Sequence, residues 1–171
     1  KLQLRYPSLV VYIPSCRKVF DEKFREGLEK YEIKGKVISQ QDDSELIPYI
    51  YSLAKLALCK SGTVNMELAL YGIPQIIGYR VSRVTAFIAK RILNFKVRFI
   101  SPVNLLVKKF IIPEFVQKNF NEKKIFFKAC RVLDLESEKT KIKKGYTLLK
   151  KELGEEGVVD RAAKEIINSI I

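Results

Sequence analysis

A short polar turn between two apolar runs holds the residues of this chain that are best suited to bind a ligand. Ser61, Gly62 and Thr63 follow the apolar run 56–59 and precede a helical pattern over 64–71. Gly62 allows the backbone to turn sharply, and Ser61 or Thr63 can cap the helix that follows. Because the N–H groups at the start of a helix attract anions, this turn predicts a phosphate-binding site.

Glu67 lies one helical turn beyond this site. Its carboxylate is suited to accept hydrogen bonds from two neighbouring hydroxyls, as a ribose presents. An exposed carboxylate on a helix surface is the alternative interpretation of Glu67. Ser61 and Thr63 are likewise common helix caps in proteins of any function.

The elements around the turn form a predicted strand–helix–strand unit. The run 56–59 is typical of a strand buried on both faces. The helix over 64–71 stops at Gly72 and cannot continue past Pro74. A second apolar run, 75–79, follows. Open α/β sheets bind ligands at the carboxyl ends of their strands, which is where this unit places the polar turn.

Strands and helices alternate through the first hundred residues and give way to helices after residue 121. Further strands are predicted over 9–13, which Pro14 ends, over 36–38 and over 95–100. Helices are predicted over 21–31, 44–53, 82–93, 123–133, 136–153 and 158–171, with Ser44 as a cap and Leu46 as an alternative start. The segment 104–113 is a loop or short helix. The pattern predicts an α/β fold with a parallel sheet, helices on both faces and C-terminal helices. We expect one domain over 1–171, with its α/β core over 1–120.

The chain is strongly basic. Its 171 residues include 32 Lys and Arg against 19 Asp and Glu, a formal net charge of +13. Such an excess attracts nucleic acid, anionic membranes or phosphorylated substrates, and it is also typical of a solvated basic surface. The predicted helix 82–93 is basic and amphipathic, which fits either an anionic bilayer or an ordinary surface position. A non-enzymatic module that binds nucleic acid or an anionic membrane is therefore an alternative function. Nucleic acid is the weaker partner because the basic residues are spread along the chain.

The cysteine and histidine content limits the catalytic and metal-binding chemistry that this chain can perform. Cys16, Cys59 and Cys130 are scattered without metal-ligand spacing, and the chain has no histidine. This excludes histidine-based acid–base or metal chemistry within the chain. Three separate thiols predict reduced cysteines in the cytoplasm or in a plastid-like organelle.

An ordered set of motifs resembles the C-terminal half of lipid-A-disaccharide synthase, a GT-B glycosyltransferase of family 19. The set comprises Ser61–Glu67, Gly72–Gln75, Gly78–Ser82, Ile88–Arg91, Ser101–Leu106 and Pro113–Glu114. It is dense from about residue 56 to 117 and thin elsewhere. The resemblance implies a Rossmann-like nucleotide-binding domain, a UDP-linked diacylglucosamine donor and a diacylglucosamine 1-phosphate acceptor. It implies no metal ion and no other cofactor.

The resemblance also implies a set of substrate-binding residues: Ser61, Gly62, Thr63, Glu67, Arg80, Asn104, Glu114 and Gln117. The first three would lie against the diphosphate, Glu67 would hold the uridine ribose, and Arg80 would neutralise phosphate charge. The other three would line the donor side of the cleft. Arg80 as a surface cation and Asn104 as a helix cap are the alternatives.

One family motif, leucine-proline-glycine-serine-arginine on the first strand and loop, has no counterpart here. Pro14–Arg17 is only slightly similar, and its spacing makes 9–13 the second strand of the domain. We therefore expect the first strand–helix unit, the acceptor domain and its catalytic base to lie outside these residues, which begin with Lys1. A fragment and a degenerate remnant both fit. We expect little activity from the chain alone, and as partners an N-terminal acceptor-domain polypeptide, an anionic membrane surface or a second copy.

Overall fold

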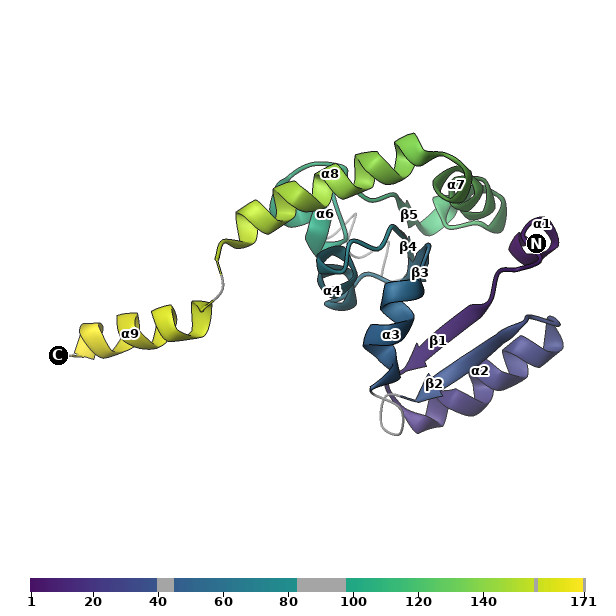
Figure 1. Ribbon diagram of the computed structural model, residues 1–171, viewed down its shortest axis with the longest axis horizontal. Helices are drawn as coiled ribbons and strands as arrows, with labels where there is room; N and C mark the ends of the chain where they lie inside the picture. The colour runs from purple at the N-terminus through teal and green to yellow at the C-terminus, as the bar shows by residue number, and fades with distance from the viewer. Residues whose placement is uncertain (40–44, 83–97, 156, 171) are drawn as a thin grey trace.

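A computed structural model describes residues 1–39, 45–82, 98–155 and 157–170. Its strands in these ranges form two separate parallel sheets (Figure 1). β1 (Val11–Ser15) pairs with β2 (Gly35–Ser39), and β4 (Gln75–Tyr79) lies between β3 (Ala57–Cys59) and β5 (Glu114–Val116). The α/β class with parallel strands is confirmed.

Helices connect the paired strands. α2 (Lys18–Lys30) joins β1 to β2, α4 (Val64–Leu70) joins β3 to β4, and α3 (Leu46–Leu53) leads from one sheet to the other. α6 (Pro102–Val107) precedes β5. The remaining elements are α1 (Leu2–Arg5), the short 3₁₀ helix η2 (Gln117–Asn119), α7 (Glu122–Asp134), α8 (Glu136–Leu153) and α9 (Val158–Ile170). The predicted bounds 136–153 are confirmed for α8.

Several predicted boundaries were wrong or lie outside the described residues. Pro14 does not end β1 but lies within it, opposite Ile38. Arg98–Ile100 are not a strand, and β5 was not predicted, because three residues beginning with a glutamate give no apolar run. Ser44 and most of the predicted helix 82–93 lie outside the described residues, as does the first half of the predicted strand 95–100.

The main hydrophobic core lies between β4, α6 and the C-terminal helices. Its buried residues are Ala69, Ile77, Val103, Ile111, Ile112, Val132, Ile142, Tyr146 and Leu149. A second cluster joins β2 to α3 and α4 through Ile38, Ile47, Tyr51, Leu68 and Ile73. The second cluster links the two sheets, so they share packing although no described strand of one pairs with a strand of the other.

Gly145 allows α8 to approach this core closely. A Cβ atom at Gly145 would lie 2.1 Å from Cγ2 of Ile111, far inside van der Waals contact. We expect Gly145→Ala to lower the free energy of unfolding by about 1–3 kcal/mol, the usual cost of overpacking. Urea unfolding tests this, and combining the change with Ile111→Ala, which removes the Cγ2 and Cγ1 atoms, should cost less than the sum of the two single changes. Strictly additive losses would show that the two residues do not compete for space.

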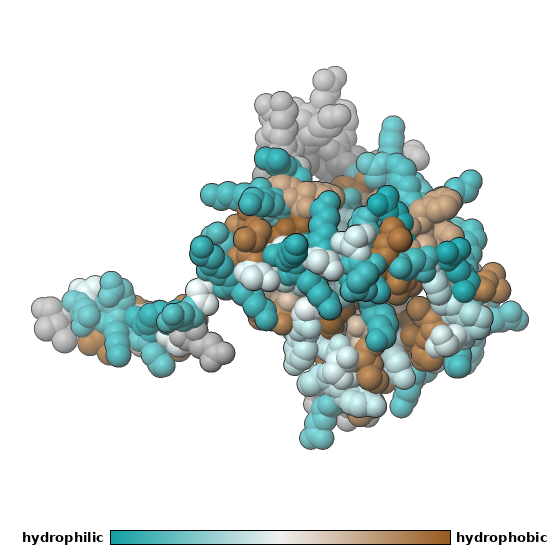
Figure 2. All heavy atoms as spheres, turned by 45° about the horizontal axis from the view of Figure 1, so that its top comes forward, coloured by the Kyte–Doolittle hydropathy of each residue, from teal (hydrophilic) through white to brown (hydrophobic). Residues whose placement is uncertain are grey.

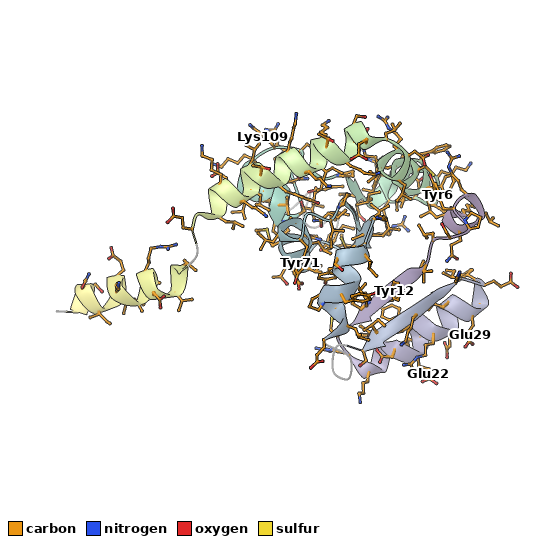
Figure 3. All side chains as sticks on the ribbon, in the orientation of Figure 1. Tyr6, Tyr12, Glu22, Glu29, Tyr71 and Lys109 are labelled. Carbon is orange, nitrogen blue, oxygen red and sulfur yellow. The ribbon has the colours of Figure 1, made fainter. Side chains whose placement is uncertain are left out.

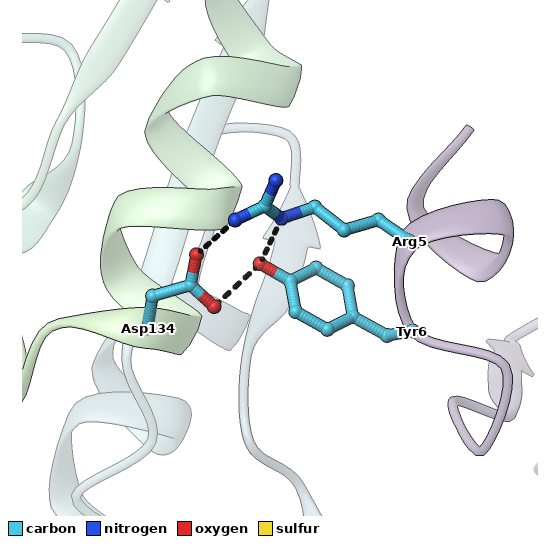
Figure 4. Close-up of polar contacts among 3 residues, drawn as sticks. All are labelled: Arg5, Tyr6 and Asp134. Carbon is cyan, nitrogen blue, oxygen red and sulfur yellow. Dashed lines mark hydrogen bonds and ion pairs between the residues drawn. The ribbon is translucent and has the colours of Figure 1, made fainter.

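The N-terminal segment is fixed to α7 by a three-residue contact (Figure 4). Arg5 Nη2 donates to Asp134 Oδ2 at 2.9 Å, and the Tyr6 hydroxyl donates to Asp134 Oδ1 at 2.7 Å. These hydrogen bonds, with that from Tyr6 the stronger influence, hold the pKa of Asp134 below its ordinary value. α1 therefore lies beside α7, which packs against β4. The contact holds the residues that lead into β1 in place.

The last helix extends away from the other elements (Figures 1 and 2). Its apolar residues Val158, Val159, Ile166 and Ile167 are exposed, whereas α7 and α8 contribute buried residues to the core. Among the described residues, no helix is both long enough and apolar enough to cross a lipid bilayer.

Candidate functional site at the carboxyl edge of β3, β4 and β5

The carboxyl ends of β3, β4 and β5 lie along one edge of their sheet, because the three strands are parallel. The residues that follow these ends are Lys60, Arg80 and Gln117. Lys60 Nζ lies 5.6 Å from the ring centroid of Tyr79, so the β3 and β4 ends are in contact. The polar turn 61–63 is part of this edge, which is where open α/β sheets bind ligands.

Asn65 holds the shape of the polar turn. Its fully buried side chain donates from Nδ2 to the Lys60 carbonyl at 3.2 Å and accepts at Oδ1 from the Gly62 N–H at 2.9 Å. Its own carbonyl accepts from Nε2 of Gln75 at 2.9 Å. Asn65 therefore connects the turn to the beginning of β4, a role that the sequence analysis missed.

The predicted capping roles of Ser61 and Thr63 were wrong. Thr63 is at the N-cap position of α4, but its side chain makes no capping hydrogen bond, because its backbone is already helical. Ser61 Oγ instead donates to the Ile100 carbonyl at 2.7 Å. The Ser61 hydroxyl is therefore bonded to the segment that precedes α6. The Gly62 N–H, near the start of α4, is bound instead by the Asn65 side chain.

Cys59, the last residue of β3, lies two residues before this turn, and its thiol is partly buried. Burial raises its pKa to about 11, while the hydrogen bond from Asn65 acts in the opposite direction. Since the thiolate is the reactive form of cysteine, a raised pKa disfavours nucleophilic chemistry at this position.

A network of side chains holds residues 100 and 101 against the turn. Glu114 Oε2 accepts from the Ile100 N–H at 2.8 Å, and Oε1 accepts from the Ser101 N–H at 2.9 Å. Asn104 Nδ2 donates to Glu114 Oε1 at 2.8 Å. Together with the bond from Ser61, these contacts connect the end of β3 to the beginning of β5 through one short backbone segment.

The side chain of Asn104 is fully buried and uses its whole hydrogen-bonding capacity. Its Nδ2 donates to Ile112 O and Glu114, and its Oδ1 accepts from the N–H groups of Ile111 and Ile112, all at 2.8–3.0 Å. An asparagine amide has two donors and two acceptor positions. In this structure Asn104 therefore stabilises the backbone at residues 111–112 and the position of the Glu114 side chain. Its contact with a donor substrate stays a prediction.

Arg80 and Gln117 lie together beyond the ends of β4 and β5. Gln117 Oε1 accepts from the Val81 N–H at 3.1 Å. Arg80 Nη2 donates to the Phe120 carbonyl at 2.6 Å, and its guanidinium carbon lies 5.3 Å from the Phe120 ring centroid. Gln117 has φ +51°, a left-handed conformation that non-glycine residues adopt at a cost. Arg80 is exposed, so its outer guanidinium face is accessible to an anion.

Glu67 is exposed on α4 and interacts with Tyr51 on α3. Burial, followed by the charge and hydrogen bonding of Glu67, raises the pKa of Tyr51 to about 12. The Tyr51 ring also contacts Tyr71 edge-to-face, with a centroid distance of 5.2 Å (Tyr71 is labelled in Figure 3). Glu67 therefore lies near the Tyr51 hydroxyl and in the first turn of α4.

The raised pKa of Tyr51 predicts a loss of stability at alkaline pH. The hydroxyl ionises near pH 10 in the unfolded chain and near pH 12 in the native state. Unfolding therefore releases a proton between these values, so the stabilisation is complete below about pH 10 and is lost as the pH rises towards 12. We expect Tyr51→Phe to weaken this dependence in urea unfolding, while Tyr49→Phe, on the exposed side of the same helix, should not. Equal pH dependence in all three proteins would contradict this assignment.

The structure brings most of the predicted residues to one edge. Ser61, Asn104 and Glu114 belong to one network, and Arg80 and Gln117 belong to a second at the ends of neighbouring strands. Lys60 is a further basic residue of this edge that was not predicted; its position directly after an apolar run and before the polar turn was the available signal. The ligand contacts of all these residues stay predictions.

The fold defines an α/β domain of the Rossmann-like class, with a polar edge at the carboxyl ends of β3, β4 and β5. The family model for lipid-A-disaccharide synthetase matches residues 1–170, and the chain belongs to the lipid-A-disaccharide synthase family. It is 45% identical over 167 residues to lipid-A-disaccharide synthase of Prochlorococcus marinus, covering 98% of this chain and 43% of that protein. The enzyme of the same name from Gloeothece citriformis is 34% identical over 170 residues, covering 99% and 43%.

The similarity therefore extends beyond residues 56–117, where the motifs are dense, to nearly the whole chain. A third relative, lipid-A-disaccharide synthase of Synechocystis, is 32% identical over 167 residues, covering 98% of this chain and 41% of that protein. The chain thus spans less than half the length of each of these three relatives.

Proposed function

We propose that this chain forms the nucleotide-binding half of a lipid-A-disaccharide synthase. This half would bind a UDP-linked diacylglucosamine, whose sugar is transferred to diacylglucosamine 1-phosphate with release of UDP. The observation that supports the proposal most directly is the family match over residues 1–170, combined with a basic and polar edge at the carboxyl ends of β3, β4 and β5.

The contacts at this edge suggest a division of roles. The 61–63 turn leads into the N-terminus of α4, which favours negative charge, while the Gly62 N–H is bound by Asn65. Lys60 and Arg80 would supply the positive charge that a diphosphate requires. Glu67, in the first turn of α4, would supply the carboxylate for the ribose hydroxyls. The backbone around these groups is held by hydrogen bonds to the side chains of Asn65, Asn104 and Glu114. We expect the general base for the transfer to come from outside this chain.

A chimeric enzyme tests this function. This chain would replace the matched 167 residues of the Prochlorococcus marinus relative, so that both halves are covalently joined. Transfer would be measured as disaccharide formed from the UDP-linked donor. We expect the chimera to be active and the isolated chain to be inactive. A folded chimera that binds neither UDP nor the donor would contradict the proposed role.

A further inference from the structure

We propose that Ser15, Asp21 and Ser39 form a binding site for one alkali-metal cation, K⁺ or Na⁺, between α2 and the sheet of β1 and β2. This site belongs to the other sheet from the candidate nucleotide edge, and it does not depend on nucleotide binding. The cation takes one side-chain oxygen from each of β1, α2 and β2. It therefore fixes this strand–helix–strand unit and makes its stability depend on the cation present.

Two of these side chains are buried without a hydrogen-bond partner. Oδ1 of Asp21 and Oγ of Ser39 have none among the described residues, and each residue is only 5% exposed. Asp21 also takes part in none of the ion pairs between described residues. A buried carboxylate without a compensating group is costly, and nearly all buried polar atoms in native proteins have a partner. The two atoms therefore indicate a ligand at this position.

Ser15 and Ser39 lie side by side at the carboxyl ends of β1 and β2. They are partners in the register of the parallel pair, in which neighbouring strands lie about 4.8 Å apart and partner side chains point to the same face. Ser15 is buried, and its hydroxyl donates to the Arg17 carbonyl at 3.2 Å. Because that bond uses the hydroxyl proton, the lone pairs of the Ser15 oxygen remain available to a cation.

α2 covers the face of the sheet that carries both serines (Figure 1). A Cβ atom at Gly35 would lie 3.2 Å from Cδ2 of Leu28, and Ser39 shares the face of Gly35 because side chains alternate along a strand. Asp21 is buried on the same side of α2 as Leu28, two helical turns or about 10 Å earlier. Gly35 and Ser39 are about 13 Å apart along β2. Since α2 runs antiparallel to β2, Asp21 lies beside Ser39.

The donor atoms define the class of cation. All three side-chain ligands are oxygens, which hard cations prefer. The described residues contain no group of three His, Cys, Asp or Glu side chains that could hold a metal ion, so a transition metal does not fit. A single carboxylate balances one positive charge, whereas a divalent cation would leave a net charge in a buried site. Asp21 also lies in the first turn of α2, where the helix dipole favours its negative charge.

Urea unfolding in different chloride salts at equal ionic strength tests this proposal. The chain would be compared in KCl, in NaCl and in tetramethylammonium chloride, whose methylated nitrogen cannot be coordinated by oxygen ligands. A cation at about ten times its dissociation constant shifts the equilibrium about tenfold towards the native state. We expect the unfolding constant of the unchanged chain to be at least about tenfold smaller in KCl or NaCl than in tetramethylammonium chloride. Equal unfolding constants in the three salts would overturn the proposal.

Matched variants separate this site from a general effect of salt. Asp21→Asn removes the charge with little change of shape and should abolish the difference between the salts. Asp160→Asn, in the first turn of the exposed helix α9, should retain it. Ser39→Ala removes one ligand and should shift the KCl titration to higher concentration, whereas Ser52→Ala, at an exposed position of α3, should not. An unchanged salt preference in Asp21→Asn, or in Ser39→Ala if Asp21→Asn does not fold, would overturn the proposal.

Discussion

Asn104→Ala is expected to lower the free energy of unfolding by about 3–4 kcal/mol. The change removes four hydrogen bonds. It leaves the N–H and the carbonyl of Ile112 without the partners that Asn104 supplies, whereas the Ile111 N–H keeps the Lys109 carbonyl as an acceptor. Each buried polar group without a partner costs about 1–3 kcal/mol. Urea unfolding followed by circular dichroism measures the loss.

The matched control for Asn104 is Asn168→Ala on the exposed helix α9. Exposed substitutions usually change stability by less than about 0.5 kcal/mol. A further variant, Asn104→Asp, keeps the acceptor for Ile111 and Ile112 but places a second carboxylate against Glu114. It should therefore also be destabilising, and less so when the pH is low enough to protonate one carboxylate. A loss similar to that of Asn168→Ala would show that the network does not stabilise the fold.

Arg80→Ala is expected to weaken UDP binding by about tenfold to a hundredfold. A hydrogen bond from a charged donor contributes about 1.5–3 kcal/mol, which corresponds to this range. Arg80 is held in place by the carbonyl and ring of Phe120, and Phe120 is fixed in turn against β4, where a Cβ at Gly78 would lie 2.3 Å from its ring. The guanidinium of Arg80 is thus already held at the strand ends, so its side chain would lose little conformational entropy when UDP binds.

Calorimetric titration with UDP measures this effect. Lys164→Ala, on α9, removes the same unit of charge away from the edge and is the matched control. If the Arg80 contact is local, the control should bind like the unchanged chain, and added salt should weaken binding to the unchanged chain more than to Arg80→Ala. Equal losses in the two variants would indicate a general effect of net charge.

The sequence predicted individual helices and strands better than the elements against which they pair or pack. Helix 136–153 has a regular apolar spacing and was predicted with its observed bounds. β5 was not, because it is short, begins with Glu114 and is stabilised by pairing with β4. The prediction of a strand buried on both faces at 56–59 was wrong, because the Leu58 side chain is 54% exposed. The apolar run at 56–59 indicates the burial that this strand is suited for, but the groups that would cover it are not determined by the run itself.

The candidate site was predicted in position more than in detail. Parallel strands bring their carboxyl ends together, so the position of the turn after β3 at that edge of the sheet could be predicted from the pattern alone. The structural roles of Asn65 and Asn104 could not, because they depend on backbone groups that become neighbours only in the folded chain. Ser61 similarly binds Ile100, a partner 39 residues away in the sequence.

The central claim is that this chain contains the donor-nucleotide site, and calorimetric titration with UDP of the chain and of Glu67→Ala tests it most directly. Glu165→Ala on α9 is the control for loss of an exposed carboxylate. We predict that the unchanged chain and the control bind UDP alike, and that Glu67→Ala binds at least about tenfold more weakly, since a charged hydrogen bond contributes about 1.5 kcal/mol or more. Equal binding by Glu67→Ala, or no binding by any of the three folded proteins, would contradict the account.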